Sequence, residues 1–144
     1  MKIIITLFAL FLVSPTIAFA ERSQTFGDIE VHFNALSTTE LSPDMAKAYK
    51  LDRSRNRGMI TVAVLKKDKA GVGQPIKAVI SASAVNLSSQ LTDITIREIL
   101  EEKAIYYLGD YRVGAPDTLK FNLTIKPQGE KKSLNVEFQQ QFFP

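Results

Sequence analysis

Hydrophobic and polar residues alternate along most of the chain after its first twenty residues. Near the start of this region, Ile29, Val31 and Phe33 fall on one face of an extended chain, and charged or polar residues fall on the other. The same period of two returns in 119–126 and 134–143. Such alternation is typical of strands with one face packed and the other in water. The pattern therefore predicts several half-buried β-strands.

Two segments depart from this alternation. Residues 59–65 read MITVAVL, a continuously apolar and β-branched run that indicates a strand in the middle of a sheet. Residues 42–49 begin with Ser-Pro-Asp, a helix start signal in which Pro43 suits the first helical position. We expect a central strand at residues 59–65 and one short helix at residues 42–49.

The alternating segments predict about seven strands, separated by short turn signals, with one small helix after the first strand. Because the strands do not alternate with long helices, a parallel α/β fold is excluded. The predicted fold class is all-β, an antiparallel β-sandwich of immunoglobulin-like type that lacks the cysteines and tryptophan of antibody domains. A closed β-barrel is the alternative, since strand count and alternation do not separate the two architectures.

Residues 1–20 predict a cleavable signal peptide. Lys2 precedes an apolar run at 3–13, and small residues end the segment. The apolar run is about half the ~20 residues that a spanning helix needs. We therefore expect cleavage before Glu21, a periplasmic location, one domain over residues 21–144, and no membrane anchor in the mature protein.

Composition narrows the function classes. Once Lys2 is removed, 17 basic side chains oppose 15 acidic ones, a balance too even to indicate nucleic acid as the partner. The chain has one histidine and no cysteine, so we expect no disulfide, no lipid anchor on a cysteine and no transition-metal site. No phosphate-binding glycine motif is present, and we expect no cofactor.

Positive charge is densest in residues 51–58, LDRSRNRG, which we call the arginine stretch. Serine, asparagine and glycine between the arginines favour an extended or turn conformation. If it is extended, Arg53, Arg55 and Arg57 project to one side and form an anion-binding surface. One alternative is a solvated loop in which an arginine forms an ion pair with Asp52 or a nearby glutamate. Another is that the stretch forms part of a protein interface.

The histidine and a pair of tyrosines are further candidates. His32 shares its strand face with Glu30 and Asn34, but no G-x-S-x-G motif supports its use as a catalytic base. Tyr106 and Tyr107 must point to opposite faces of a strand, and an exposed tyrosine is a common recognition anchor. Both features also have a purely structural interpretation, as a surface histidine and as a buried, hydrogen-bonded tyrosine.

Five segments carry a resemblance to a known family: FGDIEVHFNAL, LSPDMAKAYKLDRSRNRGMITVAV, a Ser/Ala-rich strand ending in Asn86-Leu87, KAIYYLGDYR and QQQFFP. In this order they resemble a family of short exported proteobacterial proteins classed as a domain of unknown function, numbered four-four-two-six. The resemblance implies a periplasmic location and one β-rich domain, and it implies no activity. The recurring features it carries over are Phe26, Gly27, His32, Asn34, Tyr49, Arg53, Arg57, Tyr106, Tyr107, Phe142 and Phe143.

Export, sandwich patterning and the lack of a catalytic constellation predict a non-enzymatic periplasmic binding domain. Its partner is an envelope protein or another envelope component, and the sequence specifies neither the identity of that partner nor the oligomeric state. One alternative is a small-ligand site for an anionic metabolite or glycan, and another is a hydrolase that uses His32. The expected binding residues are His32, Asn34, Arg53, Arg55, Arg57, Tyr106 and Tyr107, with no catalytic, cofactor or metal residues.

Overall fold

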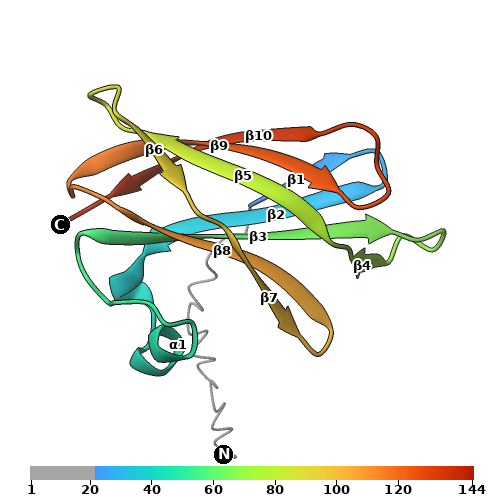
Figure 1. Cartoon of the computed structure of the whole chain (residues 1–144), viewed down its shortest axis with the longest axis horizontal. Coiled ribbons are helices and arrows are strands. Elements are labelled where there is room, and N and C mark those ends of the chain that lie inside the picture. Colours follow the sequence, from blue (N-terminus) through green and yellow to red (C-terminus); the bar gives the residue numbers. More distant parts are fainter. Residues whose placement is uncertain (1–21) are drawn as a thin grey trace, which may run out of the picture.

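The computed structural model describes residues 22–144, which form two antiparallel sheets packed face to face (Figure 1). The signal peptide predicted at 1–20 lies outside the described residues. The helical segments are η1 (Thr38–Glu40) and α1 (Pro43–Ala48). The strands are β1 (Arg22–Phe26), β2 (Ile29–Ser37), β3 (Arg57–Lys67), β4 (Gly73–Pro75), β5 (Ala78–Val85), β6 (Leu91–Ile94), β7 (Arg97–Glu101), β8 (Ala104–Arg112), β9 (Asp117–Pro127) and β10 (Leu134–Phe142).

The larger sheet has the order β1-β2-β3-β8-β7, with β4 also paired to β3, and the smaller sheet has the order β10-β9-β5-β6. Within the larger sheet β3 lies between β2 and β8, which confirms the central position predicted from its apolar sequence. The predicted antiparallel β-sandwich is confirmed, and the two sheets do not close into the alternative barrel.

The described chain contains ten strands rather than about seven. One addition is β1, which turns into β2 at Gly27, where φ is +62° and a side chain would be strained. Another is the short β4. The third arises because residues 91–101 run from the smaller sheet, as β6, into the larger sheet, as β7 (Figure 1). Alternation continues through this crossing without a turn residue, so the sequence shows one strand where the fold uses two.

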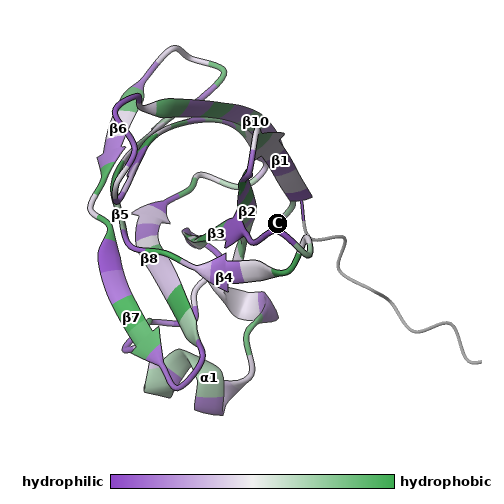
Figure 2. Cartoon of the chain, turned by 90° about the vertical axis from the view of Figure 1, so that its right-hand side faces the viewer, coloured by the Kyte–Doolittle hydropathy of each residue, from purple (hydrophilic) through white to green (hydrophobic). Residues whose placement is uncertain are grey.

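Alternate side chains from both sheets fill the space between them. The predicted inward positions Ile29, Val31 and Phe33 are buried, and so are the inward positions of β9. Phe138 of β10 stacks on Phe121 with ring centroids 4.8 Å apart, and its ring centroid lies 4.7 Å from that of Phe33. Figure 2 views the two sheets end on, with the smaller sheet arched over the larger one and α1 beneath. Packing between the two sheets therefore replaces the disulfide that the chain lacks.

A second apolar cluster covers part of the outer face of the larger sheet. The helix α1 begins as predicted, with Pro43 in its first turn and the Ser42 hydroxyl accepting a hydrogen bond from the backbone N–H of Met45. Arg97 of β7 donates a hydrogen bond to the backbone carbonyl of Tyr49 just after the helix. The cluster consists of Leu41, Ala46, Met59 and Leu108, with Leu36, Tyr49, Leu51 and Ile99 around them. No helix of the described residues has the length and apolarity to cross a bilayer.

Candidate functional site

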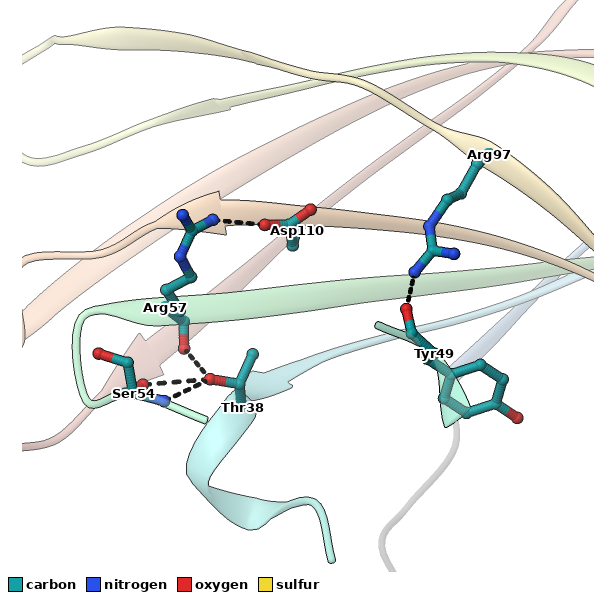
Figure 3. A network of polar contacts seen from close by, with 6 residues as sticks. All are labelled: Thr38, Tyr49, Ser54, Arg57, Arg97 and Asp110. Atoms are coloured by element: carbon teal, nitrogen blue, oxygen red, sulfur yellow. Dashed lines mark hydrogen bonds and ion pairs between the residues drawn. The ribbon is translucent and has the colours of Figure 1, made fainter. Parts of the chain in front are cut away.

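The arginine stretch has no helical structure, as its sequence predicts, and runs from the loop after α1 into β3, whose first residues are Arg57 and Gly58. Its backbone is held by Thr38, which is fully buried. The Thr38 hydroxyl accepts a hydrogen bond from the Ser54 N–H at 3.0 Å, and the carbonyl oxygens of Ser54 and Arg57 lie 3.1 and 3.3 Å from it (Figure 3). A single buried side chain therefore fixes the path of the connection.

The three arginines do not share a partner. The Arg57 guanidinium forms an ion pair with Asp110 of β8, at 2.5 Å between Nη1 and Oδ2 (Figure 3). Arg53 donates instead to the backbone carbonyl of Thr39 at 3.1 Å. Arg55 is exposed, and no hydrogen bond or ion pair joins it to another described residue. With Arg53 and Arg57 held by separate partners and Arg55 exposed, the geometry matches a solvated loop with individual pairings more closely than one anion-binding patch.

His32 and Tyr106 come together although they lie far apart in the sequence. Both face outward from the larger sheet, on β2 and β8, and Ala63 of β3 lies between them, directly opposite His32 in the strand register. These three residues line a shallow groove of about 280 Å³, which we call the His32–Tyr106 groove. Its walls include Gly73 and Pro75 from β4, Lys103 from the turn before β8, and Ala104 and Ile105 from the start of β8.

A short chain of polar contacts begins at His32 in the lining of this groove. The Nε2 atom of His32 lies 3.4 Å from Oε1 of Glu30, and Oε2 of Glu30 lies 3.3 Å from the ammonium of Lys67. All three groups are partly buried. The carboxylate of Glu30 therefore neutralises positive charge beside the groove and orients the imidazole ring.

Asn34 and Tyr107 have different surroundings. Asn34 is the next outward residue of β2, opposite Thr61, and its Oδ1 accepts a hydrogen bond from the N–H of Ala35 at 3.0 Å. Tyr107 points inward as predicted for one member of the pair, is 3% exposed, and accepts a hydrogen bond from the Ala78 N–H at 2.7 Å. Its hydroxyl also lies 3.2 Å from Oε2 of Glu98. Burial is also the main cause that raises the pKa of Tyr107. Because this side chain is buried and bonds to β5, it links the two sheets and is not a surface anchor.

A larger cavity lies at the end of the sandwich that is on the left in Figure 1, and we call it the end cleft. It occupies about 550 Å³ between the two sheets, where β3, β6 and β9 begin and β5 and β8 end. The sequence does not reveal it, because its lining comes from four segments that only the sheet pairing brings together. Among the described residues, no group of three or more histidines and carboxylates has the arrangement of a metal site.

Comparison with known proteins agrees with the fold. Residues 23–144 match the family described as Domain of unknown function (DUF4426). The chain belongs to the DUF4426 family. The resemblance seen in the sequence is thereby confirmed. A crystal structure of a DUF4426 protein from Pseudomonas aeruginosa PAO1 is 32% identical, covers 86% of this chain and 95% of that one, and superposes with a TM-score of 0.72.

The DUF4426 fold is also similar to FetP of uropathogenic Escherichia coli strain F11, which was expressed in the periplasm. FetP is 13% identical and covers 85% of this chain and 93% of its own, with a TM-score of 0.60. A copper-bound FetP variant gives 14% identity, 85% and 95% coverage, and a TM-score of 0.61. At these identities the likeness shows the fold alone. Among curated proteins, none matches this DUF4426 chain.

Proposed function

We propose that this DUF4426 protein is an exported, non-enzymatic binding domain that recognises another protein or an envelope component through the outer face of its larger sheet. The observation that carries the proposal is the His32–Tyr106 groove. It gathers the histidine and the exposed tyrosine that the sequence singles out on one surface. The predicted signal peptide and the periplasmic expression of the similar FetP support a periplasmic location.

The size of the groove favours a macromolecular partner. At about 280 Å³ it lies just below the ~300 to 1,000 Å³ typical of pockets that enclose a whole small ligand. Its floor is the small side chain of Ala63, and Tyr106, 37% exposed, stands at its rim. Recognition surfaces concentrate binding energy in a few aromatic anchors and the pockets beside them. The groove therefore suits one apolar side chain of a docked partner.

The surroundings of the groove add polar specificity. His32 and Lys103 both line the groove, and Glu30 and Lys67 lie beside His32, so a partner meets polar and charged groups around the groove. Complementary charges of this kind select partners and orient them more than they add affinity. The arginine stretch does not carry the proposal, because Arg53 and Arg57 bond separate partners and Arg55 bonds no described residue.

Photo-cross-linking in living cells tests this function. A benzoylphenylalanine residue replaces Tyr106, and in the control it replaces Thr124, an exposed residue of β9 on the outer face of the smaller sheet. We expect discrete adducts from position 106 and none from position 124.

A second change makes the test specific to the groove. Ala63→Leu fills the floor from the outer face, between the core residues Val62 and Val64, and should abolish the adduct. The proposal fails if positions 106 and 124 give the same adducts, if neither gives any, or if Ala63→Leu changes nothing.

A further inference from the structure

The end cleft combines an apolar floor with a polar rim. Ala84 and Leu119 of the smaller sheet and Tyr111 of the larger sheet are all buried and form the floor. At about 550 Å³ the volume lies in the middle of the range for pockets that hold small ligands. The cleft is built from both sheets and from the connections that join their strands.

Planar polar side chains supply most of the rim. Asn86 and Gln90 stand together, since Nδ2 of Asn86 donates to Oε1 of Gln90 at 2.8 Å. Oδ1 of Asn86 accepts hydrogen bonds from the N–H groups of Ser88 and Gln90, at 3.0 and 2.9 Å. The Asn86 side chain therefore shapes the turn before β6, and it leaves the amide nitrogen of Gln90 available as a donor.

Two opposite charges also line the cleft. Asp117 uses Oδ1 to accept a hydrogen bond from the Thr118 N–H at 2.7 Å, which leaves Oδ2 available. No ion pair joins Asp117 or Arg112 to another described residue. The third charged residue of the lining, Arg57, is already paired with Asp110. Once Asp110, the partner of Arg57, is counted, the charges at the cleft balance, and the lining presents both donors and acceptors.

We propose that the end cleft binds a small neutral sugar of one or two rings. Each sugar hydroxyl both donates and accepts, and planar amide, carboxylate and guanidinium groups bond two neighbouring hydroxyls at once. The apolar floor faces the C–H side of the ring. A net-neutral lining gives no advantage to an anion, whose charge would have to lose its hydration without a matching positive excess. This site is separate from the His32–Tyr106 groove.

Titration calorimetry of the mature protein tests the proposal with glucose, N-acetylglucosamine and maltose, and with inorganic phosphate as the anion probe. Each probe is used up to about 10 mM, which nearly saturates a site with a Kd of ~1 mM or tighter. We expect saturable binding of at least one sugar and none of phosphate. Asp117→Asn removes the charged acceptor and should weaken sugar binding about tenfold.

Gly114 offers a way to block the cleft without disturbing the fold. It lines the cleft, its φ lies outside the left-handed region, and a Cβ built on it meets no atom within 4 Å. Gly114→Trp should abolish sugar binding. The matched control is Ser133→Trp, an exposed loop position at the opposite end of β9, which should bind as the wild type does.

The inference is overturned if none of the sugars binds, if phosphate binds in their place, or if Gly114→Trp binds a sugar as tightly as Ser133→Trp. Cross-linking from position 106 should be the same in Gly114→Trp as in wild type, so failure of one site is distinguishable from failure of the other.

Discussion

Thr38 and Ser54 are joined at both polar groups of the Ser54 backbone, whose N–H lies 3.0 Å and whose carbonyl oxygen lies 3.1 Å from the Thr38 hydroxyl. Thr38 is polar but fully buried, unlike the apolar side chains that make up the buried core of the described residues. The Thr38 hydroxyl thus bonds backbone groups of the loop before β3, which has no helix or sheet hydrogen bonds of its own. It also holds the start of β3 in place through the Arg57 carbonyl.

Replacing Thr38 by valine keeps the shape of the side chain and removes the hydroxyl. The Ser54 N–H, which is partly buried, then loses its partner, and we expect the free energy of unfolding to fall by about 1 to 3 kcal/mol. Urea denaturation followed by circular dichroism measures the change. Thr38→Ser keeps the hydroxyl and loses one methyl group, so it should cost only about 0.8 kcal/mol. Equal losses in the two variants would contradict this role.

The ring of Tyr111 lies against the backbone of Gly58 in the neighbouring strand. A Cβ on Gly58 would lie 2.4 Å from Cε2 of Tyr111, and Phe121 and Phe142 hold the other sides of the ring. Gly58→Ala should therefore destabilise the protein by about 1 to 3 kcal/mol through overpacking. This outweighs the ~0.4 to 1 kcal/mol that alanine gains by restricting the unfolded chain.

Gly114→Ala is the control for this prediction, because its added Cβ meets open space. We expect its unfolding free energy to stay within about 0.5 kcal/mol of wild type. If both glycine variants lose the same stability in urea, the close approach of Tyr111 is not the cause.

Tyr107 links the sheets through its hydroxyl, which accepts from the Ala78 N–H and reaches Glu98. Tyr107→Phe leaves the Ala78 N–H without this partner and should lower the free energy of unfolding by about 1 to 2 kcal/mol. Amide hydrogen exchange should show the largest loss of protection at Ala78. Tyr106→Phe on the opposite face, which changes an exposed hydroxyl, should leave exchange at Ala78 unaltered.

Stability should decline at alkaline pH. Burial raises the pKa of Tyr111 far above its ordinary value, so the folded protein keeps this phenol protonated while the unfolded chain ionises near pH ~10. The stabilising contribution is complete below that pH, and above it the folded state holds one more proton than the unfolded state. The free energy of unfolding then falls by up to about 1.4 kcal/mol per pH unit from this group.

Urea midpoints measured between about pH 8 and pH 11 test this expectation. Tyr111→Phe should be less stable at neutral pH and should show a shallower alkaline decline than wild type. An unchanged slope in Tyr111→Phe would assign the alkaline effect to other groups.

Some features follow from local sequence and were predicted correctly. The alternation at Ile29, Val31 and Phe33 decides which side chains enter the core, because successive residues of a strand point to opposite faces. Ser42 and Pro43 decide where α1 begins. The Ser42 hydroxyl accepts a hydrogen bond from a backbone N–H of the first turn, and Pro43 has no N–H that would need a partner. Both depend only on residues close together in the chain.

The sites depend on contacts that local patterns do not contain. The sequence places His32 on the polar face of its strand and one of Tyr106 and Tyr107 on an outward face, but only the pairing of β2, β3 and β8 brings His32 and Tyr106 to one groove. The arginine stretch was correctly predicted to be non-helical, whereas the pairing of Arg57 with Asp110 depends on the register between β3 and β8. The sequence by itself determined the strands, the helix start and the inward faces. Only the tertiary structure decided which outward side chains meet, because strand order and register are set by contacts between distant segments.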